Sequence, residues 1–455
     1  MPSVDFTLPT AATSEDEKHT LKGKTVSPFD RLPDEVVSLI LELVWSPSPT
    51  DPIPEEAIHP PATRGDLLIC KRFHRLGLPI WFRSVGSGAI RDGRVEVVIT
   101  RPAVRPLVRH ATVSTRKELV NGEIALFAGC PNLRSVSICE PWGEESEPDP
   151  PFSTSFTFNL DDLSQITHFS ILGANVYDTL DTIPADFSLG VALPNLRSLT
   201  LSVVPNRELA RLLMSVDNLR HLNLGVSAQS ESYLVYGAIP WTGLEHLELR
   251  GLDVRPATWT NALYTITHDL TLLHRHRSED LPPLTLRRLS LTDLSMDPRY
   301  DEMSEKRKEK TKQGLRDFVH HLESMGLERL DIDQYELQRW PTKLRTLKVL
   351  SLSKVRLYEY SNFSAFTSHL SRFPSLERLY LHDTPLAPRR PPVKPTYGSV
   401  PCATWYPHLA TLERLLKATG VLVAEWRDDG IGLQWTREKK GEEFRVETRG
   451  FALQD

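Results

Sequence analysis

The sequence predicts an α/β protein in which a small N-terminal module of three helices precedes an irregular solenoid of repeats, with a parallel sheet on the concave face. Two observations predict the solenoid. The pattern Leu-x-x-Leu-x-Leu recurs from Leu196 to the copy that begins at Leu376. Amphipathic segments lie between several copies. A third observation predicts the module, because apolar residues between Phe29 and Val85 are dense and recur at helical spacing.

Composition and charge are those of an ordinary globular protein. The 455 residues include 54 Lys and Arg and 59 Asp and Glu, which gives a formal net charge of −5. This balance argues against a basic protein that coats nucleic acid and against an acidic disordered chain. The four cysteines are too few and too scattered for a disulfide framework or a Cys-x-x-Cys zinc pair, so we expect a reducing compartment.

The sequence shows neither a membrane-spanning segment nor a secretory signal. No run approaches the roughly 18 apolar residues of a membrane span, and the first residues lack the apolar region of a secretory signal. We therefore expect a protein of the cytoplasm, the nucleus or both, with neither a membrane nor a nucleic acid as its partner.

The character of the chain changes at three places and predicts four parts. Residues 1–27 are rich in Thr, Ser, Glu and Lys, which predicts a disordered tail. Residues 28–86 form the helical module and residues 100–420 the repeat solenoid. Residues 421–455 contain three strand-like segments, which predict a C-terminal cap.

Copies of the repeat are more numerous than the one or two that chance predicts. Strict copies begin at Leu196, Leu219, Leu244, Leu281, Leu286, Leu347 and Leu376, and the two that begin at Leu281 and Leu286 overlap within one repeat. Looser copies span 132–138, 165–171 and 326–332, and a faint one spans 107–113. Each unit has an apolar face that stays open until a neighbour stacks on it, so the array forms as a whole and needs capped ends.

Helix candidates lie between several copies. Asn206 suits the N-cap of a helix over 207–216, and other candidates span 314–325, 364–373 and 409–420. A helix followed by a strand, repeated along the chain, resembles the leucine-rich-repeat family, although these copies lack the Asn that closes the family's segment. The resemblance implies a solenoid with parallel strands on its concave face.

The N-terminal module begins with a Leu-Pro pair and a helix over 31–44 whose apolar face carries Val36, Val37, Ile40, Leu41 and Val44. After a Pro-rich loop at 46–65, a second helix carries Leu67, Leu68, Cys70, Phe73 and Leu76, and a short third helix carries Leu78, Ile80, Trp81 and Val85. Three small helices with this much apolar surface are too few for a stable domain, so we expect a partner to cover them.

The pattern Leu-Pro-x-Glu-Val, an apolar helix, Leu-x-x-Cys-Lys-x-Phe and Leu-Pro-x-Trp over residues 29–85 resembles an F-box. The long Pro-rich loop departs from the family. The resemblance implies docking on the Skp adaptor of a cullin-RING ubiquitin ligase. It also implies that eight residues face the adaptor or shape that face: Leu32, Pro33, Val36, Ile40, Leu68, Cys70, Phe73 and Trp81. The alternative is that these helices only cap the repeats.

Alternation along parallel strands predicts which side chains line the concave face, because residues that flank the inward-pointing leucines share one side of the sheet. These residues are His221, Asn223, His246, Glu248, Arg250, Arg288, Ser290, Thr292, Arg329, Asp331, Asp333, Arg378, Tyr380 and His382. Arg and Tyr often anchor protein interfaces. The mixed signs favour a protein target over a phosphate backbone, which requires a run of one sign.

Catalytic chemistry requires a nucleophile with a base, paired carboxylates or a metal cluster, and no such set stands out. His274 and His276, and likewise His320 and His321, lack helical metal-ligand spacing and are interpreted as surface or helix histidines. The charge run over 300–313 predicts a solvated helix or loop. We therefore expect no enzymatic activity, no metal and no cofactor.

The sequence thus predicts a substrate-recognition subunit of an SCF (Skp-cullin-F-box) ubiquitin ligase, which binds Skp through the module and a protein target through the repeat face. The alternative is a leucine-rich-repeat scaffold without ligase function, and an enzyme is the third hypothesis. The first two differ in whether the surface of residues 29–85 is exposed in the absence of a partner.

Overall fold

The computed structural model consists of two compact units, Met1–Arg83 and Ser84–Asp455. The predicted tail, residues 1–27, lies outside the described residues, as do Leu68 and Cys70. The described residues are 32–45, 71–86, 97–98, 100–114, 127, 129–139, 153–154, 163–172, 179–180, 185–226, 232–251, 257–258, 260–276, 284–292, 294–295, 305–333, 343–353, 368–382, 412–414, 416–417, 419–428 and 431–450.

The first unit contains the helices α1 (Asp34–Trp45) and α3 (Lys71–Trp81). Val37 and Leu41 of α1 are buried, and the partly buried side chains that pack against them are Leu32, Phe73, Leu76, Ile80 and Trp81. Asp34 ties the two helices together, because its carboxylate lies 2.7 Å from the Arg72 guanidinium and also pairs with Arg75.

The prediction of separate second and third helices in this unit is wrong over the described residues. A single helix, α3, continues through Pro79, although a proline inside a helix removes one backbone donor and crowds the carbonyl four residues earlier. The helix ends two residues later, at Trp81. Val85, which was predicted to lie in the third helix, lies instead in strand β1 (Ser84–Gly86), which pairs with β2 in the second unit. The unit therefore ends at Arg83 and the repeats begin earlier than residue 100.

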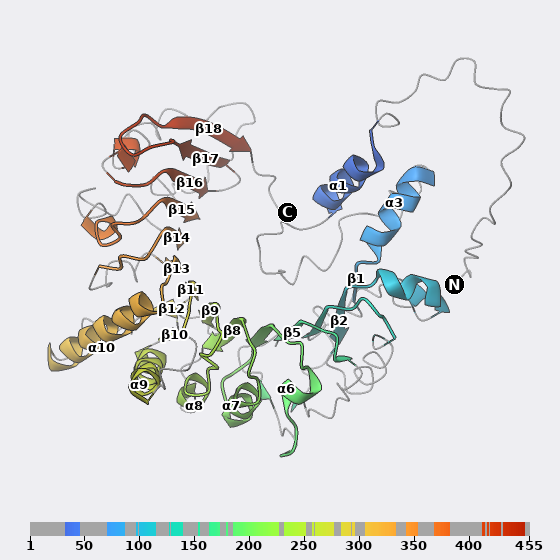
Figure 1. Cartoon of the computed structure of the whole chain (residues 1–455), viewed down its shortest axis with the longest axis horizontal. Helices are drawn as coiled ribbons and strands as arrows, with labels where there is room; N and C mark the ends of the chain where they lie inside the picture. Colours follow the sequence, from blue (N-terminus) through green and yellow to red (C-terminus); the bar gives the residue numbers. More distant parts are fainter. Residues whose placement is uncertain are drawn as a thin grey trace, which may run out of the picture. The chain divides into compact units, whose positions relative to one another are not determined.

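The second unit is built on a 14-stranded sheet whose strands follow one another in chain order (Figure 1). Neighbouring strands are parallel from β1 to β16, and only β17 and β18 at the C-terminal end run antiparallel. The strands after β1 are β2 (His110–Ser114), β3 (Ser135–Cys139), β5 (His168–Leu172), β7 (Ser198–Ser202), β8 (His221–Val226), β9 (His246–Gly251), β11 (Arg288–Thr292), β13 (Arg329–Asp333), β14 (Val349–Ser353), β15 (Arg378–His382), β16 (Val423–Asp428), β17 (Ile431–Thr436) and β18 (Arg445–Gly450).

The parallel repeat sheet predicted from the leucine pattern is confirmed, and even the faint copy at 107–113 supplies a full strand, β2. The three strand-like segments near the C-terminus are confirmed as β16, β17 and β18. Two short strand pairs lie outside the main sheet, β4 (Ser153–Thr154) with β6 (Thr179–Leu180) and β10 (Ala257–Thr258) with β12 (Leu294–Ser295).

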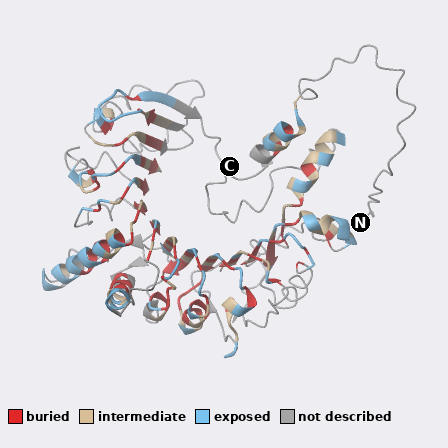
Figure 2. Ribbon diagram, viewed as in Figure 1, coloured by how far each residue is buried: buried red, intermediate tan, exposed pale blue. Residues whose placement is uncertain are grey.

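The apolar positions of the repeat form the core. In the copy that begins at Leu196, the three leucines Leu196, Leu199 and Leu201 are 2%, 0% and 0% exposed, and the copies that begin at Leu219, Leu244, Leu286, Leu347 and Leu376 are buried in the same way. Buried and half-buried positions alternate along β7, whereas the three central residues of β11 and of β14 are all buried. Figure 2 shows the buried residues along the strands of this sheet. Because side chains two residues apart on a strand share one face, alternation places Leu199 and Leu201 on the same face of the sheet.

The helices of the second unit lie along one side of the sheet (Figure 1). Asn206 caps α7 as predicted, since its Oδ1 accepts a hydrogen bond of 2.9 Å from the Leu209 amide. The helix predicted at 314–325 is confirmed but begins earlier, at Glu305. The helices of this unit include η3 (Pro102–Leu107), α6 (Leu189–Ala192), α7 (Arg207–Met214), α8 (Ser232–Tyr236), α9 (Thr260–His276) and α10 (Glu305–Ser324).

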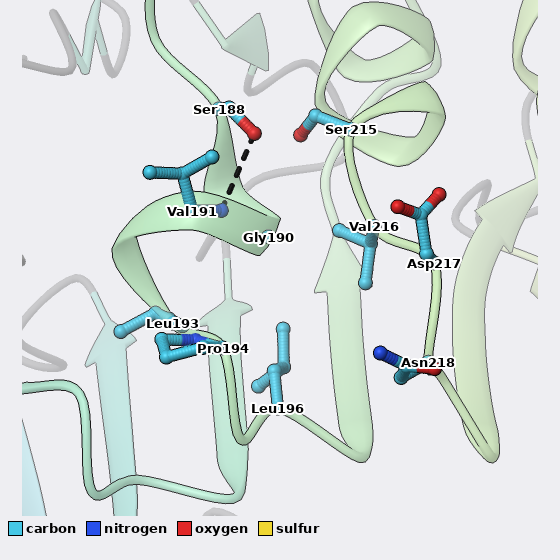
Figure 3. A pocket seen from close by; sticks show the side chains of 10 residues that line it. All are labelled: Ser188, Gly190, Val191, Leu193, Pro194, Leu196, Ser215, Val216, Asp217 and Asn218. Atoms are coloured by element: carbon cyan, nitrogen blue, oxygen red, sulfur yellow. Dashed lines mark hydrogen bonds between the residues drawn. The ribbon is translucent and has the colours of Figure 1, made fainter.

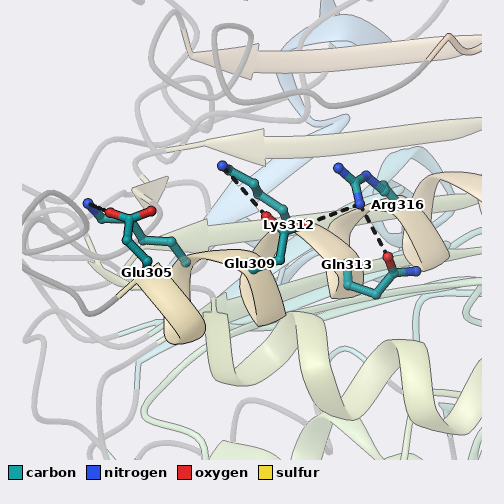
Figure 4. A network of polar contacts seen from close by, with 6 residues as sticks. Glu305, Glu309, Lys312, Gln313 and Arg316 are labelled. Carbon is teal, nitrogen blue, oxygen red and sulfur yellow. Dashed lines mark hydrogen bonds and ion pairs between the residues drawn. The ribbon is translucent and has the colours of Figure 1, made fainter.

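Residues 305–313 of the charge run that was predicted over 300–313 form the first half of α10, and residues 300–304 lie outside the described ones. Side chains of α10 pair along the helix surface, with Lys308 2.8 Å from Glu305 and Arg316 3.3 Å from Glu309 (Figure 4). Oppositely charged residues three apart, such as Glu305 and Lys308, lie on one helix face and support the helix, and Glu309 and Arg316 are two turns apart on one face. The charges therefore support the helix itself.

A row of backbone hydrogen bonds joins the repeats just before each strand. We call the residues concerned the entry row: Arg109, Arg134, Thr167, Arg197, Arg220, Glu245, Arg287, Glu328, Lys348, Glu377 and Leu422. Each member after Arg109 donates its N–H to the carbonyl of the preceding member, at 2.7–2.9 Å, and the next residue along the chain shares that carbonyl. Because backbone groups make these bonds, the position accepts any residue that has a backbone N–H, which excludes only proline, and the same bond recurs from one member of the row to the next.

Neighbouring repeats also approach closely at α6, beside a small pocket (Figure 3). The Gly190 amide donates to the Ser215 carbonyl at 3.1 Å, and the Ser215 Oγ accepts from the Leu189 amide at 3.0 Å. A Cβ atom on Gly190 would lie 2.3 Å from the Ser215 carbonyl oxygen. Glycine is thus required at this contact.

We predict that Gly190→Ala destabilises the second unit by about 1–3 kcal/mol, because the added methyl group forces the two backbones apart. Urea unfolding followed by circular dichroism measures the change. Val191→Ala is the matched control, since Val191 is 79% exposed and loses little on truncation. Equal stability of Gly190→Ala and wild type would contradict the close approach.

Candidate functional site

The register of the sheet aligns the predicted face residues in three rows on the side away from the helices. The first row runs His221, His246, Arg288, Arg329, Val349, Arg378. The middle row runs Asn223, Glu248, Ser290, Asp331, Ser351, Tyr380, Glu425. The last row contains Arg250, Thr292, Asp333, Ser353 and His382. The structure describes the backbone of Asp333 but not its side chain.

One carboxylate joins two arginines at the centre of this face. Asp331 on β13 accepts a hydrogen bond of 2.7 Å from Nε of Arg288 on β11, and one of 3.0 Å from Nε of Arg329 on its own strand. Asp331 is 7% exposed. Charge-assisted hydrogen bonds are stronger than neutral ones, and both arginines are held through Nε alone. Within the described part of the chain, no hydrogen bond involves their terminal nitrogens.

Aromatic side chains extend the centre toward β15. The Arg329 guanidinium lies over the ring of Tyr380, at 6.0 Å from the ring centroid. The Tyr380 ring in turn stacks on His382, with centroids 6.0 Å apart and an interplanar angle of 4°. A cation over an aromatic ring gains about 0.5–1 kcal/mol at an exposed site. Arg329 is therefore positioned on two sides, by Asp331 and by Tyr380.

Three histidines continue the first row toward the N-terminal repeats. The rings of His221 and His246 meet edge to face at 5.8 Å. Burial lowers the pKa of His246 to about 3, and the positive charge of Arg288 adds to this effect. Burial also lowers the pKa values of His221 and His168. These histidines are neutral near pH 7, so the cationic character of this row comes from its arginines.

Glu248 is the acidic side chain beside the histidines. Burial raises its pKa, the nearby Asp331 carboxylate acts in the same direction, and Arg288 and Arg250 oppose the rise. Arg250 itself is exposed on the last row. The face thus offers cationic, acidic and aromatic groups over a few neighbouring strands, which is the composition of a protein-binding surface.

Among the described residues, no group of three or more His, Cys, Asp or Glu side chains is placed to hold a metal ion. The pocket beside Gly190 is lined by one titratable side chain, Asp217, together with apolar and hydroxyl groups. In the described part of the chain, no helix is both long and apolar enough to traverse a lipid bilayer.

Some members of the site were missed by sequence reasoning. His168 belongs to the first row, because it aligns with Ser198 and through it with His221. It lies in the loose copy at 165–171, and the alternation rule applied to that copy predicts its place on this face. Glu425 ends the middle row and is 6% exposed. It was assigned to the cap, because β16 carries no leucine repeat. On the helical side, His274 stacks on His321 at 5.0 Å, a contact between α9 and α10 with no signal in the sequence.

The predicted adaptor residues in the first unit divide into two groups. Leu32, Phe73 and Trp81 pack against the core formed by Val37 and Leu41. Pro33 and Val36 are exposed, whereas Ile40 is half-buried. Leu39, which the sequence did not single out, is 54% exposed, compared with 38% for Val36. The single apolar face predicted for this helix is therefore split, and Val36 with Leu39 lies outside the core.

Comparisons with known proteins add no assignment to this geometry. No protein-family model matches the chain, and no curated protein sequence matches it.

We predict that Asp331→Asn destabilises the second unit by about 1–3 kcal/mol, because it leaves two neighbouring arginines without their shared carboxylate. A double-mutant cycle with Arg288→Met measures the pair directly by urea unfolding, and we expect a coupling of about 0.5–3 kcal/mol. Arg250→Met is the control on the same face. Strict additivity of Asp331→Asn and Arg288→Met would show that the contact contributes nothing.

We also predict an acid-sensitive contribution from His246. The folded state lowers its pKa from 6.5 to about 3, so the unfolded chain takes up the proton first as the pH falls. Stability is therefore lost from about pH 6.5 downward, by at most about 1.4 kcal/mol per pH unit for one proton. His246→Gln should lose less stability than wild type between about pH 7 and pH 5.5 in urea unfolding.

His268→Gln provides the matched control, because the His268 side chain is 70% exposed. We expect its pH dependence to follow the wild type. An identical pH dependence for His246→Gln and wild type would show that His246 is not held neutral.

Proposed function

We propose that the chain is a substrate-recognition subunit of an SCF ubiquitin ligase, with the first unit docking on the Skp adaptor and the repeat face binding a protein target. The observation that carries the proposal is the exposed apolar pair on α1. Val36 and Leu39 are 38% and 54% exposed, next to a Leu-Pro pair and a second helix that match the F-box pattern. A partner surface that covers them gains the free energy of burying apolar area.

The size of the first unit supports the same proposal. Its described core consists of two buried side chains, Val37 and Leu41, with partly buried neighbours. Burial on this scale stabilises a unit weakly, and small modules of this kind depend on a partner. The two helices also belong to a compact unit of their own, which ends at Arg83.

The target side of the proposal rests on the three rows of polar residues described above. They lie on the side of the sheet away from the described helices (Figure 1), and we call this side the helix-free face. Arg288 and Arg329 are oriented by Asp331 and by Tyr380, so they lose little side-chain entropy when a partner binds. Their terminal nitrogens suit the carboxylates and carbonyls of a protein surface. The proposed mechanism is proximity, in which a bound target stays at high effective concentration near the ligase's conjugating enzyme, without catalysis by this chain.

We predict that the full chain co-purifies with the Skp adaptor and that Leu39→Asp with Val36→Asp reduces capture more than tenfold, because two charges replace apolar contacts in a buried interface. Glu35→Ala on the same helix is the matched control and should retain capture. Circular dichroism verifies that each variant is folded. If folded wild-type chain fails to bind Skp, the ligase proposal fails and the capped scaffold takes its place.

A further inference from the structure

The entry row, defined above by its backbone hydrogen bonds, changes its charge pattern along the sheet. Its first five members are Arg109, Arg134, Thr167, Arg197 and Arg220, with no acidic residue among them. Its next five members alternate in sign: Glu245, Arg287, Glu328, Lys348 and Glu377. Neighbouring members are about 4.8 Å apart, the spacing of strands in a sheet. The two halves therefore share one backbone geometry and differ in charge.

Two members of the second half form an ion pair with each other. Lys348 lies 2.9 Å from Glu328, and their hydrogen bond lowers the pKa of Glu328 and raises that of Lys348. Glu245 lies 3.5 Å from Arg220, at the junction of the two halves. A partner that approaches this half meets an acidic side chain at every second position of the row.

The first half differs at three positions. Arg109, Arg134 and Arg197 are exposed, and the described part of the chain provides none of them with an ion-pair partner. Their backbones are held at 2.8–2.9 Å by the bonds of the row. Asn132 and Asn195 fix the adjacent turns, because their side chains donate to the carbonyls of Pro106 at 2.6 Å and of Ser164 at 2.9 Å. The arginines therefore project from a rigid edge.

We propose that Arg109, Arg134 and Arg197 form a binding surface for an extended acidic segment of a partner protein. From Arg109 to Arg220 the row spans about 19 Å, which an extended peptide of about six residues covers at about 3.3 Å per residue. Each guanidinium fits a carboxylate through two parallel N–H groups. The surface is separate from the helix-free face and does not depend on ligase function.

The same row argues against a nucleic acid as its partner. A phosphate chain that follows the row beyond Arg220 meets Glu245, Glu328 and Glu377, which repel it. The whole chain also carries a net charge of −5, whereas phosphate backbones attract proteins with continuous positive surfaces. A short acidic peptide fits the length of the cationic half.

The test uses the full chain and a fluorescein-labelled peptide of six glutamates, followed by fluorescence anisotropy at about 20 mM salt, where screening is weak. We expect Arg134→Gln with Arg197→Gln to weaken binding at least about fivefold. The matched control, Arg287→Gln with Lys348→Gln, removes the same charge from the other half of the row and should stay within about twofold of wild type.

Three outcomes would overturn the proposal. They are absence of peptide binding to the folded wild type, equal weakening in both double variants, and tighter binding of a six-nucleotide thymidine strand with the same dependence on Arg134 and Arg197. The last outcome assigns the surface to phosphates. Because glutamine keeps the aliphatic part of each exposed side chain, the variants retain the fold, and circular dichroism verifies this.

Discussion

The parallel register between successive repeats is the constraint on which the rest of the second unit depends. Two kinds of bond maintain it. The strand hydrogen bonds pair equivalent residues, such as Leu247 with Leu289, and the entry row adds a bond before each strand. A slip by one residue would turn every buried leucine to solvent. The burial of the leucines and the alignment of the polar rows therefore have a single cause.

This register also explains why a functional face exists at all. Parallel sheets are usually covered by helices on both sides, but the described helices here lie along one side. The other side carries polar and charged residues, because the alternation that buries the leucines places their neighbours there. Charges that are distant along the chain thus become neighbours, as Arg288 and Asp331 are at 2.7 Å. The cost of partly burying Asp331 is offset by two guanidinium groups.

The chain presents three surfaces with different physical character, one on the first unit and two on the repeats, and they share no residue. The exposed apolar pair on α1 gains free energy when a partner covers it. The helix-free face combines arginines, histidines and Tyr380, and it suits a mixed protein surface. The first half of the entry row is cationic and rigid. On the repeats, the side chains of the helix-free face and of the entry row can be substituted without loss of the backbone bonds that stack the repeats, because side chains take no part in those bonds.

The sequence by itself determined the repeat architecture. Leucines that alternate along short strands, in one repeat after another, are buried when successive repeats stack side by side. It also determined which residues share the helix-free face and that Asn206 caps a helix. Tertiary structure decided what local patterns do not contain. Alternation does not reveal that Asp331 joins Arg288 and Arg329, that His274 meets His321, or that α3 continues through Pro79. These depend on distances across neighbouring elements, and the split of Val36 and Leu39 from Val37 depends on which side of α1 faces α3.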